Sequence, residues 1–253
     1  MINNFLKKIT NFFGFDITRI NNEIKNISFD EILQRRLLNN PIIFDVGANQ
    51  GQSIERFSKL FSNFTIHSFE PIAEEFDKLK NKFGNINNIY LNNFALGEKE
   101  EKKGFYVAAK SETSSFNKIN SGTDWLKKRS KDFNTSEKEY TKYAMVNIKT
   151  LDNYCKRNNI NKIDILKIDT QGYEDKVLEG SLEAIKKNQI GIVITEIIFD
   201  DVYDKYFNFS DLEKFLIPYN FRMVGINLIN NNIFSGLVFS ADVMYFNKKH
   251  HNI

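Results

Sequence analysis

The segment IIFDVGANQG, residues 42–51, carries the strongest structural signal in this chain, together with the acid Glu70. A short apolar run passes through Asp45 into a loop bounded by Gly47 and Gly51. A second apolar run closes on Glu70, roughly 20 residues beyond the loop, which is the layout of a nucleoside site at the edge of a parallel sheet. Ligands of open α/β sheets bind outside the carboxyl ends of the strands. We therefore expect a cofactor that contains a nucleoside.

The loop favours S-adenosylmethionine (SAM) over a nicotinamide dinucleotide. The dinucleotide fingerprint G-x-G-x-x-G needs glycine at its third position so that the pyrophosphate can approach the backbone, and here that position is Asn49. A cofactor without phosphates and with a charged methionine tail suits a carboxylate and backbone amides better than it suits a phosphate cradle. An NAD-dependent oxidoreductase stays open as the less favoured alternative.

Composition points to one α/β enzyme domain. The chain has 253 residues, enough for one large domain, and a formal net charge of +3, too small for a nucleic-acid partner. The single cysteine, Cys155, excludes an intramolecular disulfide and a cysteine-cluster zinc site. No apolar run has transmembrane length, and Lys7 and Lys8 interrupt the N-terminal apolar residues, which argues against a signal peptide. We expect a cytoplasmic enzyme.

The chain divides into an N-terminal helical extension, residues 1–40, and a main domain, residues 41–253. Apolar residues recur at helical spacing in the extension, and packing on the main domain is favoured over a membrane-surface helix. Residues 110–142 are rich in Ser, Thr, Lys and Asn and interrupt the main domain. We expect this stretch to be a lid or insertion that faces the substrate, with disorder as the alternative.

From residue 41 onward, strand and helix patterns alternate, which predicts a parallel sheet. The expected strands are Ile42–Val46, Thr65–Phe69, Ile89–Asn92, Ile163–Ile168, 191–197, 221–226 and 243–246. Helices are expected from Gln52, from Pro71 in a first turn, and over 210–216. Only a hairpin-like loop joins the last two strands, so they should be antiparallel. Residues 105–109 and 143–148 are expected to pair as an added hairpin.

Several motifs follow one another in a fixed order along the chain. They are FDVGANQG (44–51), FEP (69–71), NFALG (93–97), TLD (150–152), LKIDTQGYE (166–174), VLEG (177–180), Glu196 and Ala241-Asp242. In this set, over roughly residues 41–246, the chain resembles the FkbM-type SAM-dependent methyltransferases. The resemblance implies the class I methyltransferase fold, a Rossmann-like α/β fold. Its seven-stranded, mostly parallel sheet has an antiparallel last strand and helices on both faces.

The resemblance also implies O-methylation of a hydroxyl on a small acceptor, commonly a saccharide or a natural product. One position departs from many relatives, which have Glu where this chain has Gln171. The Gln form also resembles part of the family, but it removes one candidate ligand or base. A non-catalytic SAM-binding protein of the same fold is the alternative, and a homo-oligomer is left open.

A first set of residues is expected to bind the cofactor. The set is Asp45, Gly47, Ala48, Asn49, Gly51, Glu70, Pro71, Asn93, Ala95 and Asp169. Glu70 should accept hydrogen bonds from the ribose hydroxyls, and Asp45 and the loop amides should hold the methionine tail. By resemblance, Asn93 and Ala95 flank the adenine. The structural alternatives are a helix-dipole role for Glu70 and turn formation for Asp45 and Asn93.

A second set should act on the acceptor. Methyl transfer is an in-line displacement, so much of the catalysis is positioning, but an alcohol must also lose its proton. Asp169, Lys167 and Glu174 are the catalytic candidates, with a buried Lys–Asp ion pair as the structural alternative for the first two. Gln171, Glu196 and Ser115 are expected to contact substrate.

A metal is the other way to activate a hydroxyl. Asp169, Glu174 and Glu196 would offer the oxygen ligands that Mg²⁺ prefers. Carboxylates at strand ends are common without metals, so Mg²⁺ is not favoured and we predict no metal ligand.

Overall fold

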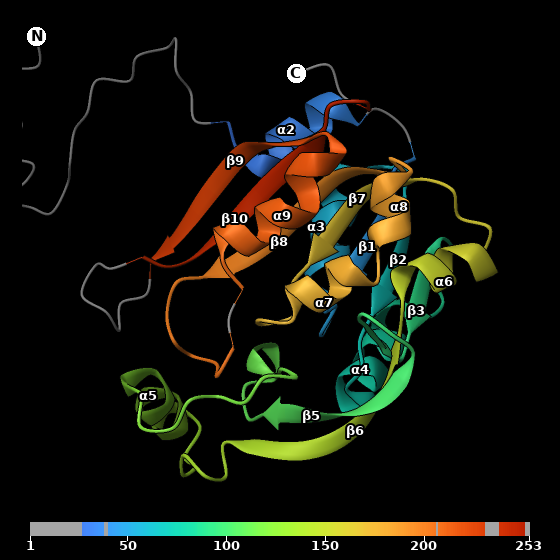
Figure 1. Ribbon diagram of the computed structural model, residues 1–253. Coiled ribbons are helices and arrows are strands. Elements are labelled where there is room, and N and C mark those ends of the chain that lie inside the picture. The colour runs from blue at the N-terminus through green and yellow to red at the C-terminus, as the bar shows by residue number, and fades with distance from the viewer. Residues whose placement is uncertain (1–26, 38–39, 206, 231–237, 251–253) are drawn as a thin grey trace, which may run out of the picture.

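The computed structural model describes residues 27–37, 40–205, 207–230 and 238–250, and its centre is a seven-stranded sheet (Figure 1). The strands are β1 Ile42–Val46, β2 Thr65–Phe69, β3 Ile89–Asn92, β7 Ile163–Ile168, β8 Ile190–Ile198, β9 Phe221–Asn230 and β10 Val238–Asn247. Their order is β3-β2-β1-β7-β8-β10-β9, and only β10 runs antiparallel to both of its neighbours. The predicted class I methyltransferase sheet is therefore confirmed.

Helices cover both faces of this sheet (Figure 1). One face carries α2 Phe29–Arg36, α3 Gln52–Leu60 and α4 Ala73–Phe83; the other carries α6 Leu151–Arg157, α7 Glu174–Glu179, α8 Leu182–Lys186 and α9 Phe209–Leu216. Neighbouring residues of a strand point to opposite faces, so Ile43 packs with the α2–α4 layer and Phe44 with the α6–α9 layer. Because both faces are covered, the central strands are almost continuously apolar.

A smaller sheet lies beside the carboxyl edge of the main sheet (Figure 1). It contains β4 Ala95–Leu96, β5 Glu101–Ala108 and β6 Thr141–Lys149, and β5 pairs antiparallel with β6. The expected hairpin is thus confirmed, with Phe105 opposite Ala144. We call residues 101–149 the insertion module.

The part of the insertion module between its two strands is folded. It contains the 3₁₀ helix η1, Ser111–Thr113, and the helix α5, Asp124–Asp132. Trp125 and Leu126 of α5 pack with Tyr203, which follows β8, in a small apolar cluster separate from the two main layers. The tertiary contact of Trp125 explains why this stretch is ordered despite its polar composition.

The start of α4 differs from the prediction. This helix begins at Ala73 with Ile72 as its N-cap residue, so Pro71 lies outside the first turn, where it had been predicted. The reason is the extended backbone of Ile72, whose amide donates to the Glu70 side chain at 2.8 Å.

Of the expected N-terminal helices, α2 is described, and residues 1–26 lie outside the described residues. Ser28 caps α2, and Leu33 is fully buried against the main domain. Within the described ranges no helix combines the length and apolar character needed to cross a bilayer.

Candidate functional site

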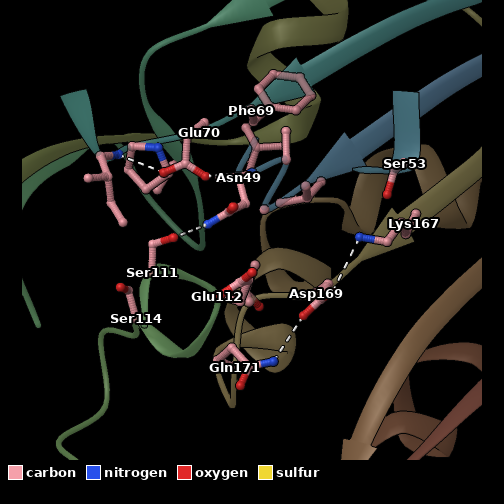
Figure 2. A pocket seen from close by; sticks show the side chains of 18 of the residues that line it. Asn49, Ser53, Phe69, Glu70, Ser111, Glu112, Ser114, Lys167, Asp169 and Gln171 are labelled. Carbon is pink, nitrogen blue, oxygen red and sulfur yellow. Dashed lines mark hydrogen bonds and ion pairs between the residues drawn. The ribbon is translucent and has the colours of Figure 1, made fainter. Parts of the chain in front are cut away.

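A cavity of about 360 Å³ opens where the strand order reverses, at the carboxyl ends of β1 and β7. Its lining comes from the loop after β1, the start of α3, the end of β2, β4, the end of β7 and the insertion module. This is the switch point at which open α/β sheets bind ligands, and the volume is that of a small-molecule site. Figure 2 shows several of the lining side chains.

The loop after β1 is held by its own backbone amides. Gly47 and Ala48 both donate to the carbonyl of Phe69, at 3.1 and 3.0 Å. Asn49 donates to Glu70 Oε2 at 2.8 Å, the Gln50 amide donates to Asn49 Oδ1, and the Gly51 amide donates to the Ala48 carbonyl. Every amide from Gly47 to Gly51 therefore has an acceptor inside the protein. Gly47, Ala48 and Asn49 line the cavity, whereas Gly51 caps α3 behind it.

Glu70 is buried at the cavity wall, with 3% of its surface exposed. Its Oε1 accepts from the Ile72 amide and its Oε2 from the Asn49 amide, each at 2.8 Å. Burial raises the pKa of this carboxyl to about 7, although the two amide donors oppose the shift. Each carboxylate oxygen keeps a second lone pair, so Glu70 can still accept a pair of hydroxyl hydrogens.

A row of charges crosses from β1 to β7. Lys167 Nζ lies 3.3 Å from Asp45 Oδ1 and 3.4 Å from Asp169 Oδ2. Burial alone would lower the pKa of Lys167, but the two carboxylates outweigh it and hold that pKa above its usual value. Lys167 and Asp169 line the cavity; Asp45 is fully buried beneath it. Neither Asp45 oxygen has a hydrogen bond among the described residues, so the ion pair with Lys167 is what offsets the cost of burying this carboxylate.

Gln171 connects this row to the insertion module side of the cavity. Its backbone has φ 56°, a left-handed value that is uncommon for glutamine and that clusters at functional sites. Its Nε2 donates to Asp169 Oδ1 at 3.0 Å and to Glu196 Oε2 at 2.8 Å, and its Oε1 accepts from the Tyr203 hydroxyl at 3.0 Å. Both amide hydrogens are thus committed to protein carboxylates. Burial and then the Asp169 charge raise the pKa of Glu196 to about 8.

Other predicted residues support the cavity without lining it. Glu174 is buried, accepts from the Thr170 amide and hydroxyl, and has its pKa raised to about 7 by burial. Ser115 donates to the Gln171 carbonyl at 2.7 Å. Asn93 donates to the Glu70 carbonyl at 2.9 Å, while its neighbour Ala95 does line the cavity. Glu196, like Glu174, Ser115 and Asn93, does not line the cavity.

Several lining residues were not singled out by the sequence. The insertion module contributes Phe105, Ser111, Glu112 and Phe116. Residues 110–142 were expected to face the substrate, but no motif indicated which of their side chains would do so. Arg56 lies on the second turn of α3, beyond the glycine loop. Amphipathic spacing predicts a helix there but not which polar side chain faces the cavity.

No group of three or more His, Cys, Asp or Glu in the described ranges is arranged to hold a metal ion. Asp169 and Glu196, two of the oxygen donors considered for Mg²⁺, both accept from Gln171 Nε2.

Known proteins share parts of this sequence. The chain is 22% identical over 170 residues to the 2-O-methyltransferase NoeI of Sinorhizobium fredii, a match that covers 65% of this chain and 66% of NoeI, just under two thirds of that relative. Among solved structures, an rRNA methylase from Streptococcus thermophilus is 12% identical with a TM-score of 0.47, covering 86% of this chain and 93% of that one.

TrmK from M. capricolum, solved with S-adenosyl-homocysteine, is 11% identical with a TM-score of 0.44, covering 88% of this chain and 70% of TrmK. At this level of similarity neither structure bears on what the present chain binds. The family model described as the methyltransferase FkbM domain matches residues 45–223, well over half of the chain. The protein therefore belongs to the FkbM methyltransferase family.

Proposed function

We propose that this methyltransferase takes its methyl group from SAM and transfers it to a hydroxyl of a small acceptor. The observation that carries the proposal is the position of Glu70. Its carboxylate lines the cavity at the end of β2, and both oxygens are fixed by amides at 2.8 Å while each keeps a free lone pair. A rigid pair of acceptors at this place fits the two ribose hydroxyls of an adenosyl group.

The engaged loop amides favour SAM over a dinucleotide. The pyrophosphate of a dinucleotide approaches the backbone of the glycine-rich loop. Here every amide from Gly47 to Gly51 already has an acceptor in the protein. When bound, SAM supplies an electrophilic methyl group on a sulfonium, which needs no phosphate cradle. A cavity of about 360 Å³ is large enough for such a compact nucleoside.

Asp169 is the candidate that best fits the role of base or orienting group for the acceptor hydroxyl. It lines the cavity, whereas Glu174 lies behind Thr170. Lys167 has a raised pKa and stays protonated, so it cannot accept a proton, but its charge and the amide of Gln171 both hold the Asp169 carboxylate in place. Such fixed geometry suits a displacement in which positioning supplies much of the rate.

The acceptor side of the cavity fits a hydroxylated molecule. The insertion module contributes the aromatic rings of Phe105 and Phe116 together with the polar side chains of Ser111, Glu112 and Ser114. Apolar faces with a few placed polar groups are the usual surroundings of a small oriented ligand. A saccharide or natural-product hydroxyl is the acceptor that the family resemblance favours, and NoeI is a 2-O-methyltransferase by name.

The test is SAM binding by titration calorimetry. We expect the affinity of Glu70→Ala to fall about 10- to 100-fold, because hydrogen bonds to a charged acceptor contribute about 1.5–3 kcal/mol. In the wild type, a Glu70 pKa of about 7 means that affinity falls as the pH drops below about 7, since the protonated acid accepts poorly. Glu70→Gln should bind weakly with a flat pH profile.

Asp164→Asn is the matched control. Asp164 is a buried acid near the start of β7 that pairs with Lys162 and accepts from the Ile42 amide, and it does not line the cavity, so SAM affinity should not change. Unchanged SAM affinity in Glu70→Ala would overturn the proposed site. If the protein binds SAM but methylates no member of a broad saccharide panel, the non-catalytic alternative is favoured.

A further inference from the structure

Arg56 lines the α3 end of the cavity, together with Gln52 and Ser53 of the same helix. Its Nε and Nη2 both meet Asp30 Oδ1 of α2, at 2.7 and 2.5 Å. No hydrogen bond or ion pair joins Nη1 to any other residue that the structure describes, and a third of the side chain is exposed. A guanidinium held by one edge keeps its remaining donors for a planar anion.

Arg56 and Lys167 are the cationic side chains that line the cavity. They differ in how far their charges are met. Lys167 forms ion pairs with two carboxylates, Asp45 and Asp169, whereas Arg56 forms one among the described residues, with Asp30. The Arg56 charge also acts on the Asp242 carboxylate, but no ion pair joins the two. An anion entering the cavity is therefore attracted to Arg56 rather than to Lys167.

The start of α3 adds to this attraction. Its N-cap residue, Gly51, provides no side-chain acceptor, so the first-turn amides have no side-chain cap. The acid of the first turn, Glu55, is paired with Lys82, so the amides keep the positive partial charge of a helix start. Gln52 and Ser53 of this first turn line the cavity next to Arg56. The amides of the preceding loop, in contrast, are all engaged and offer an anion nothing.

The two ends of the cavity match the two ends of SAM. Figure 2 shows Glu70 and Ser53 on opposite sides of the cavity. In SAM the ribose and the α-carboxylate likewise lie on opposite sides of the sulfonium. We propose that Arg56 binds the α-carboxylate of the methionine tail, with Asp30 as the positioning residue that ties α2 to this site. The inference rests on the proposed SAM-dependent function.

The experiment compares S-adenosyl-homocysteine with 5′-methylthioadenosine, which has the same nucleoside but lacks the amino-acid tail. Arg56→Ala and Arg56→Gln should each weaken binding of S-adenosyl-homocysteine about tenfold or more and leave binding of methylthioadenosine within about twofold. Asp30→Ala should weaken only S-adenosyl-homocysteine, and by less. Arg56→Gln keeps most of the side-chain stem, so it serves if the alanine variant unfolds.

Glu55→Ala is the matched control, because Glu55 neighbours Arg56 on α3, pairs with Lys82 and does not line the cavity. It should change neither affinity. If Arg56 instead binds a carboxylate of the acceptor, both affinities stay as in the wild type, and our inference is overturned. An equal loss for both ligands would also overturn it, since that indicates a structural role. Wild-type protein that binds neither ligand would refute the SAM function itself.

Discussion

The carboxyl edge of the main sheet, where we propose that the cofactor binds, and the insertion module beside it surround the cavity through different kinds of contact. At the sheet edge the contacts are between backbones: Gly47 donates to the Phe69 carbonyl and Asp169 to the Val46 carbonyl. The insertion module meets the loop after β1 through a side-chain contact, Asn49 with Ser111. Its contacts with the segment after β8 include the Tyr203 hydroxyl and backbone hydrogen bonds with Val202 and Asp204. Backbone contacts depend little on side-chain identity, so we infer that the cofactor half is fixed by chain geometry and the acceptor half can vary.

The largest effect that separates the two regions is expected from Gly47→Ala. Gly47 has φ +85°, and a Cβ there would overlap the backbone carbonyl oxygen of Asp169, which cannot move without displacing β7. We expect a loss of several kcal/mol of stability, at the high end for single substitutions, together with loss of SAM binding. Thermal unfolding and calorimetry measure both.

Gly122→Ala provides the matched substitution in the insertion module. Gly122 also has a left-handed backbone, with φ +78°, but a Cβ there meets nothing within 4 Å. The strain alone should cost about 1–2 kcal/mol and leave SAM affinity unchanged. Equal losses for the two variants would contradict the difference that we draw between the regions.

The difference between the sheet edge and the insertion module also explains which features could be predicted from the sequence. The bounds of β1, β2, β3 and β7 follow from short, mostly apolar runs, and this pattern is strongest in β1 and β7, which are covered on both faces. The acids Glu70 and Asp169 follow the ends of β2 and β7 directly in the sequence. The ordering of 110–142 does not, because it depends on Trp125 packing against Tyr203, far away in sequence.

Side-chain roles were harder to foresee than positions. Lys167 could be placed on the face of Asp169 from the strand period, but its pairing with Asp45 depends on the register between β1 and β7. Gln171 was expected to contact the acceptor from its motif, and this stays a prediction. That both of its amide hydrogens serve Asp169 and Glu196 depends on β8, which lies far along the chain.

A smaller effect is expected where one side chain joins the two regions. The Tyr203 hydroxyl lies 3.0 Å from both the Thr113 carbonyl and Gln171 Oε1. Tyr203→Phe keeps the ring in its cluster and leaves the buried Thr113 carbonyl and the half-buried Gln171 Oε1 without that donor, which should cost about 1–3 kcal/mol. Because Gln171 is then held less firmly, the backbone amides of η1 and of the residues after β7 should exchange their hydrogens faster. SAM affinity should stay within about twofold of the wild-type value.

Tyr245→Phe is the control for this loss. Tyr245 is fully buried in the α6–α9 layer, and its hydroxyl donates to Glu213 at 3.3 Å, away from the cavity. It should lower the thermal midpoint without quickening exchange at η1. Faster exchange at η1 in both variants would mean that Tyr203 does not specifically join the regions.

The smallest effect tests the direct contact between the loop after β1 and η1. Asn49 Nδ2 donates to Ser111 Oγ at 3.0 Å, in a half-buried setting, so Ser111→Ala should cost about 0.5–1.5 kcal/mol. Ser136→Ala removes an exposed hydroxyl of the same module, bonded to Glu139, and should cost less.

If the two regions are coupled through Asn49, SAM binding at Glu70 should slow amide hydrogen exchange at η1 in the wild type and in Ser136→Ala but not in Ser111→Ala. The Asn49 backbone amide donates to Glu70 and its side chain donates to Ser111, so Asn49 links the carboxyl that we propose binds the ribose to η1. Equal slowing in all three proteins would show that the coupling passes elsewhere.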